Sequence, residues 1–230
     1  MSKKYDPPKP GVGDAAQAIT KAAVSAVPLL GGPAAELVNA VFTPMLERRR
    51  QEWMEQVAEA LRTLEDKRGI PIEELKNNEV FGDTVLQATQ IALRTSQDEK
   101  RAALRNAAIN AALPTAPAQS LQQMFLSFID VFTVWHIRIL KLFDAPEKNT
   151  VLVGARWPNL MMGGMAYILE NAYPKIAGNR GFYDQVWRDL YSRGLVNTES
   201  LHSTMSAQGL AEQRTSGLGR EFIEFISEPV

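Results

Sequence analysis

The sequence predicts a mainly α-helical protein, a multi-helix bundle followed by a winged-helix-like C-terminal module with a small β-hairpin. Three observations predict this class. Apolar residues recur at helical spacing over most of the chain, no alternating strand pattern occurs before residue 190, and short breaker segments separate the periodic stretches. We expect a disordered lead at residues 1–13, the bundle over residues 14–145 and the module over residues 146–230.

The composition excludes several classes of protein. The 230 residues are 45% hydrophobic and 22% charged, carry a net charge of -1 and include no cysteine. Without cysteine, neither a disulfide scaffold nor a thiolate zinc site can form. A nucleic-acid binder usually carries a basic excess, which this chain lacks.

The first apolar stretch, residues 15–46, has two interpretations. Its longest uncharged run, residues 22–35, is 14 residues long, whereas a membrane-spanning helix needs about 20. We expect two short helices here, over residues 14–27 and 33–43, packed into the core. The alternative is a membrane-active hairpin that uses Leu29, Leu30 and Phe42, although it lacks the basic polar face of interfacial helices.

Thr43 and Pro44 predict the start of the next helix, because threonine caps a helix and proline suits its first position. Gly69 is expected to end this helix. Its apolar stripe recurs at steps of 7, 4, 4 and 3 residues: Leu46, Trp53, Val57, Leu61 and Leu64. The arginines and glutamates on the other face are interpreted as solvated.

Further helices are predicted over residues 71–76, 78–94, 96–112 and 120–143. Ser96 and Glu99 suggest a capping box at the start of the third, and Ser120 and Gln123 suggest another at the start of the fourth. The helix over residues 120–143 is apolar around most of its circumference, so we expect it to be the most buried.

The C-terminal segment has the layout of a winged helix. A helix over residues 182–193 precedes two extended arms, residues 201–206 and 210–214, which we expect to form a β-hairpin around Gly209. A final helix follows, capped at Thr215-Ser216. Asp184 and Asp189 lie on the candidate recognition helix and would repel DNA phosphates, which favours a protein-binding or structural role.

The chain carries few residues for catalysis. Its two histidines are His136, midway along an apolar helix, where we expect a satisfied side chain, and His202, in the expected hairpin, where we expect exposure to solvent. No Gly-x-Ser-x-Gly elbow, phosphate-binding loop or Glu-x-x-His pair occurs. We therefore predict no catalytic residue, no metal site and no cofactor.

One segment suggests a contact surface for a protein partner. Residues 159–173 are rich in methionine, glycine and tyrosine, and methionine suits adaptable interfaces. The predicted partner-binding residues are Met161, Met162, Met165 and Tyr167. The alternative is that these residues form ordinary core against the C-terminal module.

Several segments resemble known families. Residues 46–53, 86–95, 102–113 and 124–140 resemble an uncharacterised bacterial family of small helical proteins, and the likeness extends over roughly residues 22–145. The helical body together with Leu-Gly-Arg-Glu-Phe-Ile-Glu-Phe-Ile at residues 218–226 is similar in layout to the Abi-alpha-like group, which is linked by name to abortive infection. Neither resemblance implies a particular catalytic or binding residue.

These observations together predict a non-enzymatic, cytoplasmic, bacterial protein-interaction or regulatory protein. Its expected partner is another protein or a second copy of the chain, and the resemblance implies a setting in phage defence or stress. The first alternative is a membrane-active effector that uses the apolar N-terminal helical hairpin. The second is a DNA-binding transcriptional regulator.

Overall fold

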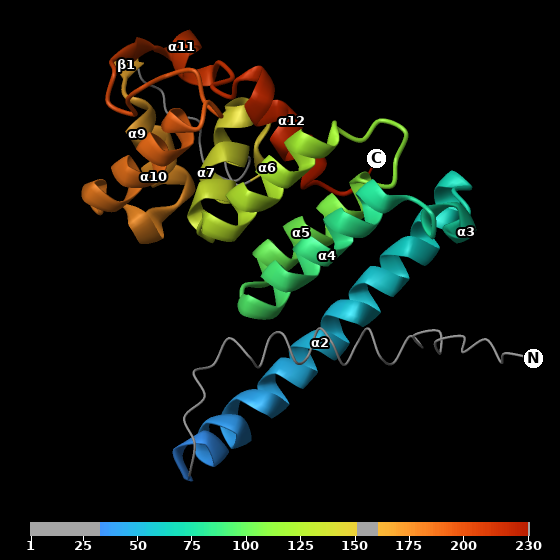
Figure 1. Cartoon of the computed structure of the whole chain (residues 1–230). Helices are drawn as coiled ribbons and strands as arrows, with labels where there is room; N and C mark the ends of the chain where they lie inside the picture. The colour runs from blue at the N-terminus through green and yellow to red at the C-terminus, as the bar shows by residue number, and fades with distance from the viewer. Residues whose placement is uncertain (1–32, 151–160, 230) are drawn as a thin grey trace, which may run out of the picture. The chain divides into compact units, whose positions relative to one another are not determined.

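The computed structural model describes residues 33–150 and 161–229, which form mainly α-helices and one small antiparallel sheet (Figure 1). The chain divides into two units, residues 1–48 and 49–230. The mainly α-helical class is confirmed. Within the described ranges, no helix combines the length and the apolar character needed to cross a membrane.

Helix α2 (Pro33–Arg68) runs without interruption through Thr43 and Pro44. The predicted helix start at Thr43-Pro44 and the separate helix over residues 33–43 are therefore wrong, and the expected helix over residues 14–27 lies outside the described residues. Pro44 removes one backbone hydrogen bond, but the segment between the prolines at positions 33 and 44 contains neither glycine nor proline and supports a helix on its own.

In the second unit, the predicted apolar stripe of α2 is confirmed. Trp53, Val57 and Leu64 are buried, and the indole Nε1–H of Trp53 donates to Oγ1 of Thr89 at 2.9 Å. Gly69, with φ of +64°, follows the last helical residue, in the left-handed conformation that glycine adopts without strain.

Three helices follow, α3 (Ile72–Leu75), α4 (Glu79–Arg94) and α5 (Asp98–Asn110). The first two match the prediction, but α5 begins two residues later than expected. Its N-cap is Gln97, whose side chain makes no capping bond, so the predicted capping box of Ser96 and Glu99 is absent. Oγ1 of Thr95 instead accepts from the backbone N–H of Gln97 at 3.2 Å, which turns the chain just before the helix.

The helix predicted over residues 120–143 is in fact two helices, α6 (Gln119–Val131) and α7 (Val134–Asp144). Ala118 is the N-cap of α6 and makes no side-chain bond, so the predicted cap at Ser120 is also wrong. The chain is extended at Phe132 and Thr133, and Thr133 forms a capping box with His136 that opens α7. A polar cap within an apolar run therefore breaks the helix.

Several side chains of both helices are fully enclosed. The prediction that this region is the most buried is nevertheless wrong, because α5 has eight buried residues among its 13, whereas α6 has four among 13 and Val131 at its end is exposed. Phe125 and Phe128 of α6 pack against Phe222 of α12 (Gly217–Phe225), with ring centroids 5.4 and 5.9 Å apart. The side-chain amide of Asn110 on α5 donates to the carbonyl oxygens of Glu224, Phe225 and Ser227. The last helix is thus anchored in the same core as the bundle.

The C-terminal region contains α9 (Met165–Ala172), α10 (Arg180–Ser192) and α11 (Ala207–Ala211), with single 3-10 turns at Pro146–Lys148 (η1) and Pro174–Ile176 (η2). The predicted helix over residues 182–193 is confirmed as α10, although it begins at Arg180. The predicted cap of the final helix is confirmed at Ser216, whose Oγ accepts from the backbone N–H of Gly219 at 2.9 Å.

The predicted β-hairpin is wrong. Strand β2 (Met205–Ser206) pairs antiparallel with β1 (Met162–Gly163), which precedes α9, and the segment after β2 is the helix α11. Oγ of Ser206 accepts from the backbone N–H of Gly209 at 3.2 Å and caps α11. This cap turns the residues around Gly209 into a helix instead of a hairpin. A separate antiparallel bridge joins Val196 and Thr215.

Candidate functional site

The methionine-rich segment does not form a single surface. Met161 is 91% exposed and Met162 is 64% exposed, and Tyr167 is also exposed. Met165 is fully buried in the core. As the first residue of α9 it faces inward, so it offers no side chain to a partner and is removed from the predicted binding surface.

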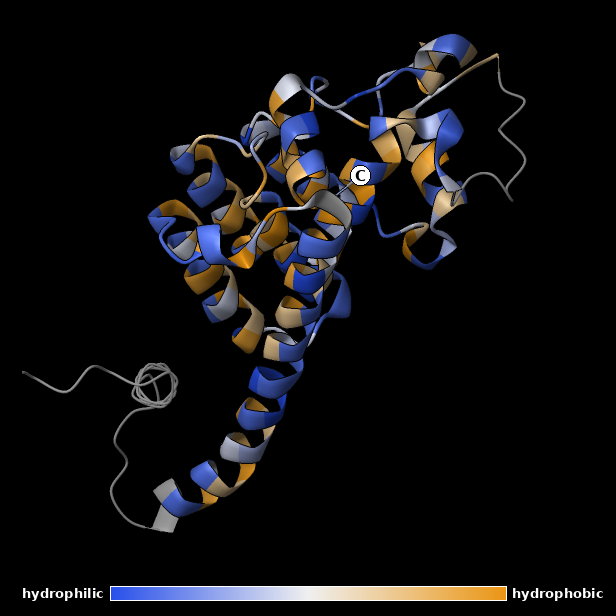
Figure 2. Cartoon of the chain, turned by 90° about the vertical axis from the view of Figure 1, so that its right-hand side faces the viewer, coloured by the Kyte–Doolittle hydropathy of each residue, from blue (hydrophilic) through white to orange (hydrophobic). Residues whose placement is uncertain are grey.

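The residues of the predicted membrane-active hairpin are only partly described. Leu29 and Leu30 lie outside the described residues, and Phe42 is exposed on α2. Leu37 and Val41 on the same helix are 71% and 66% exposed. The N-terminal turns of α2 carry hydrophobic and hydrophilic residues in close succession (Figure 2).

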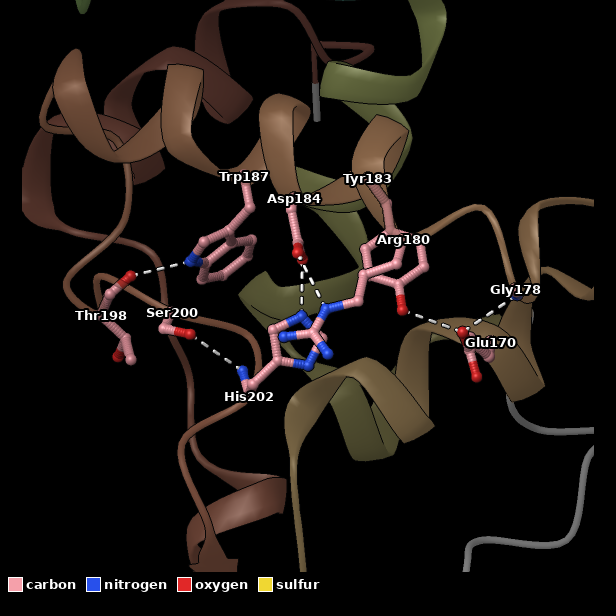
Figure 3. Close-up of polar contacts among 9 residues, drawn as sticks. All are labelled: Glu170, Gly178, Arg180, Tyr183, Asp184, Trp187, Thr198, Ser200 and His202. Atoms are coloured by element: carbon pink, nitrogen blue, oxygen red, sulfur yellow. Dashed lines mark hydrogen bonds and ion pairs between the residues drawn. The ribbon is translucent and has the colours of Figure 1, made fainter.

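His202 is half-buried and paired with α10, so the expectation that it faces solvent in a hairpin is wrong. Its Nε2–H donates to Oδ1 of Asp184 at 2.7 Å, and Oδ2 of Asp184 accepts from Nε of Arg180 at 3.2 Å (Figure 3). The backbone N–H of His202 donates to Oγ of Ser200 at 3.1 Å. The carboxylate therefore joins the loop that carries His202 to the first turns of α10.

Two further contacts shown in Figure 3 hold α10 in place. Nε1–H of Trp187 donates to the carbonyl oxygen of Thr198 at 2.9 Å. The hydroxyl of Tyr183 donates to Oε1 of Glu170 on α9 at 2.9 Å, and the same oxygen accepts from the backbone N–H of Gly178 at 3.1 Å. Burial and the bond to Glu170 raise the pKa of Tyr183 to about 12.

The second histidine is paired with the other aspartate of the same helix. Nε2 of His136 lies 3.4 Å from Oδ2 of Asp189, while Nδ1 accepts from the backbone N–H of Thr133 at 3.1 Å. Burial lowers the pKa of His136, against the raising effect of Asp189. Oγ1 of Thr133 also lies 2.9 Å from Nδ1, so both ring nitrogens have polar partners, and His136 is a satisfied histidine as predicted from the sequence.

The two His–Asp pairs link α10 to its neighbours. In the pair of Figure 3, the nearby hydroxyl of Ser200 accepts a backbone hydrogen bond and makes no bond to the imidazole. Asp184 and Asp189, which the sequence suggested as a phosphate-repelling feature of a recognition helix, each bind a histidine from another part of the chain. Across the described ranges, no three His, Asp or Glu side chains are grouped closely enough to share a metal ion.

The surface of the protein also contains a groove. A groove of 590 Å³ lies between the C-terminal half of α2, the second half of α5 and the end of the chain, elements that are labelled in Figure 1. We call it the α2–α5 groove. Its residues are Glu52, Glu55, Gln56, Glu59, Ala60, Thr63, Leu64, Arg105, Asn106, Ile109, Glu228 and Pro229.

The α2–α5 groove combines an apolar floor with an acidic rim. Ala60, Leu64 and Ile109 supply apolar surface, whereas the charged lining consists of four glutamates and one arginine. Glu59 is 75% exposed, and its nearest cation, Arg62, lies 3.7 Å away. Oε2 of Glu52 lies 3.0 Å from Nη1 of Arg101. The lining charges are thus mostly acidic, with Glu52 paired to an arginine and Glu59 exposed to solvent.

The groove as a whole is not indicated by any local pattern in the sequence. The glutamates of α2 lie on the predicted solvated face, where Glu55, Glu59 and Glu65 are exposed. The opposite wall comes from residues about 50 and 170 positions further along the chain, and no local pattern shows that these segments meet. The local signal was the recurrence of glutamates at positions 52, 55 and 59, one per helical turn.

Comparison of the chain with protein-family models, curated proteins and solved structures finds no match.

Proposed function

We propose that this protein is a non-enzymatic protein-interaction or regulatory protein and that the α2–α5 groove receives a segment of its partner. The groove itself is the observation that carries the proposal. Its volume of 590 Å³ falls within the usual range for binding pockets, about 300–1,000 Å³. An apolar floor inside a polar rim is the usual anatomy of a protein-binding surface.

The His–Asp pairs give less support for a binding or catalytic role. Their carboxylates and imidazoles already bond to each other, and these bonds connect elements of the fold. A partner would have to break such bonds before it could bind there, whereas in the α2–α5 groove the carboxylate of Glu59 is 75% exposed.

Site-specific photo-crosslinking in cells tests the proposal. A benzophenone amino acid in place of Gln56 lies in the groove, and the same amino acid in place of the exposed Leu86 lies outside it. We expect a discrete adduct from position 56 only, and its loss when Ala60→Trp fills the floor. Equal adducts at both positions, or no adduct at position 56, would contradict the proposal.

A second candidate function, a membrane-active effector, is favoured by the exposed side chains of Leu37 and Val41, which lie one helical turn apart near Phe42. Liposome flotation of the intact chain tests it against the double variant Leu37→Asp/Val41→Asp. The effector hypothesis expects flotation of the intact chain and its loss in the variant. Absence of lipid association by the intact chain removes this candidate.

For the C-terminal module we propose a winged-helix-like arrangement with a structural or protein-binding role. The order of α10, the bridge between Val196 and Thr215, and α12 supports it. Residues 180–230 contain seven acidic and five basic residues, which disfavours a DNA-binding regulator. A salt-sensitive mobility shift of duplex DNA at low salt would overturn this assignment.

The biological setting that we propose is phage defence or stress in a bacterial cytoplasm. Its support is the resemblance of residues 22–145 and of the C-terminal residues 218–226 to the families described above. Phage plating efficiency on hosts with and without the gene tests this setting. An equal efficiency for all phages tried would argue against defence.

A further inference from the structure

We infer that the partner segment is a basic amphipathic α-helix of about three turns, an inference that rests on the proposed binding role of the α2–α5 groove. Three properties of the groove lead to this occupant: its charge, its length and the elements that form its walls.

The charge of the rim favours a cationic partner, because four of the five charged lining residues are glutamates. Three of these glutamates lie beside an arginine, Glu228 at 3.9 Å from Arg105, Glu52 at 3.0 Å from Arg101 and Glu59 at 3.7 Å from Arg62. The exposed Glu55 and Glu59 are therefore the carboxylates most accessible to a partner. Glu52, Glu55 and Glu59 follow one another at steps of three and four residues, which places them about 5–6 Å apart along one stripe of α2. A helix lying alongside α2 presents lysine or arginine at the same interval.

The length of the groove fits a helix better than a small cation. The lining of α2 extends from Glu52 to Leu64, a distance of about 18 Å at the helical rise per residue. A small organic cation would cover only part of this length. The small side chain of Ala60, between Leu64 and Ile109 on the floor, leaves room for apolar side chains of the partner.

The walls favour a helical occupant over an extended one. Two of the walls are α-helices, whose internal backbone groups are already hydrogen-bonded to one another. An extended peptide would find no sheet edge here to pair with its own N–H and C=O groups. A helix satisfies these groups internally, so its burial leaves fewer unpaired polar groups.

Selection from a random library of 16-residue peptides displayed on phage tests the inference with the full-length protein. The wild type serves as bait, and the variant Ala60→Trp, which fills the floor, serves for counter-selection. We expect the enriched peptides to carry a net positive charge, with basic residues at steps of three or four and apolar residues on the opposite stripe. Circular dichroism of a synthetic peptide is expected to show a gain of helix on binding.

Affinity measurements on the best peptide by fluorescence anisotropy sharpen the test. The double variant Glu55→Gln/Glu59→Gln is expected to weaken binding about fivefold, because each exposed ion pair contributes modestly. A matched double variant outside the groove, Glu199→Gln/Glu221→Gln, has the same change in net charge and should leave the affinity within twofold. Raising the salt concentration should weaken binding to the wild type more than to the groove variant.

The outcomes distinguish the binding role of the α2–α5 groove from the identity of its occupant as a basic helix. Peptides that depend on the groove but are neutral, acidic or extended would overturn the basic helix and leave the binding function standing. Failure to enrich any peptide that Ala60→Trp rejects would overturn both. Equal loss of affinity in the two double variants would show that binding responds to net charge alone and would also overturn the inference.

Discussion

Carboxylates have different roles in two regions of this protein, the α2–α5 groove and the surroundings of α10. Near α10, Asp184 is 25% exposed and bonds to both His202 and Arg180. In the groove, Glu59 is 75% exposed and has its nearest cation 3.7 Å away. A half-buried, fully bonded carboxylate stabilises the fold, whereas an exposed one adds little to stability and is accessible to a partner. The comparison predicts large stability effects near α10 and small ones in the groove.

The largest effect is expected at Trp187, the buried indole of α10. Trp187→Ala should lower the free energy of unfolding by about 3–5 kcal/mol, because it opens a cavity beside Phe143 and removes the donor to the carbonyl oxygen of Thr198. Urea denaturation followed by circular dichroism measures the change. Trp187→Phe should recover part of the loss, and an unchanged urea midpoint for Trp187→Ala would contradict the role of α10 as core.

The next largest loss of stability is expected at Asp184, and it is compared with the loss at Glu59. Asp184→Ala should cost about 1–3 kcal/mol, because it leaves the imidazole of His202 without its acceptor. Glu59→Ala should cost no more than about 0.5 kcal/mol, since surface substitutions away from special features change stability little. Thermal unfolding of the two variants under identical conditions tests the difference. Equal shifts in Tm would remove the distinction between the regions.

The pH dependence of stability offers a third test, through His136. Burial lowers its folded-state pKa below the ordinary value of 6.5, so the unfolded chain takes up its proton first as the pH falls. Stability from this group is therefore complete above about pH 6.5 and declines as the pH falls from there through the lower folded-state pKa.

Urea midpoints between pH 7.5 and pH 5 measure this decline in the wild type and in His136→Gln. Glutamine is a usual partner in the capping box with Thr133, and it does not titrate. We expect a flatter pH profile in the variant across this window. Parallel profiles in the two proteins would show that other groups cause the decline.

The smallest effect is expected for Glu55→Gln/Glu59→Gln, which should leave Tm within about 1 °C of the wild type, because exposed carboxylates contribute little to folding. Differential scanning calorimetry checks this value. A clear rise in Tm would show mutual repulsion between the rim carboxylates, a cost to folding that is typical of a binding surface. A clear fall would place them among the stabilising residues and weaken the case for the groove.

Local signals predicted much of the helical structure. The spacing of Trp53, Val57 and Leu64 identified the buried face of α2, and Gly69 marked its end. The apolar content around Phe125 indicated a buried face, although α5 is more buried than α6. These features depend on neighbours within a few turns of one helix, which the sequence displays directly.

Errors arose where one local signal competed with another. Thr43-Pro44 suggested a helix start inside a continuous helix, and the apolar run around Phe132 hid the capping box of Thr133 with His136. Gly209 suggested a turn between strands, but the cap at Ser206 starts a helix there. At Thr133 and Ser206 a local side-chain cap, which the apolar run and the glycine obscured, decides the structure.

The sequence by itself determined that this protein is built from amphipathic helices, with no disulfide and with two histidines for any imidazole chemistry. The tertiary structure decided where the polar groups act. It paired His136 and His202 with aspartates of α10, buried Met165, and brought Glu228 beside the glutamates of α2. The physical reason is the separation along the chain between the residues that interact. Helix periodicity is a property of neighbouring residues, whereas a groove or an ion pair forms between segments whose meeting depends on how the whole core packs.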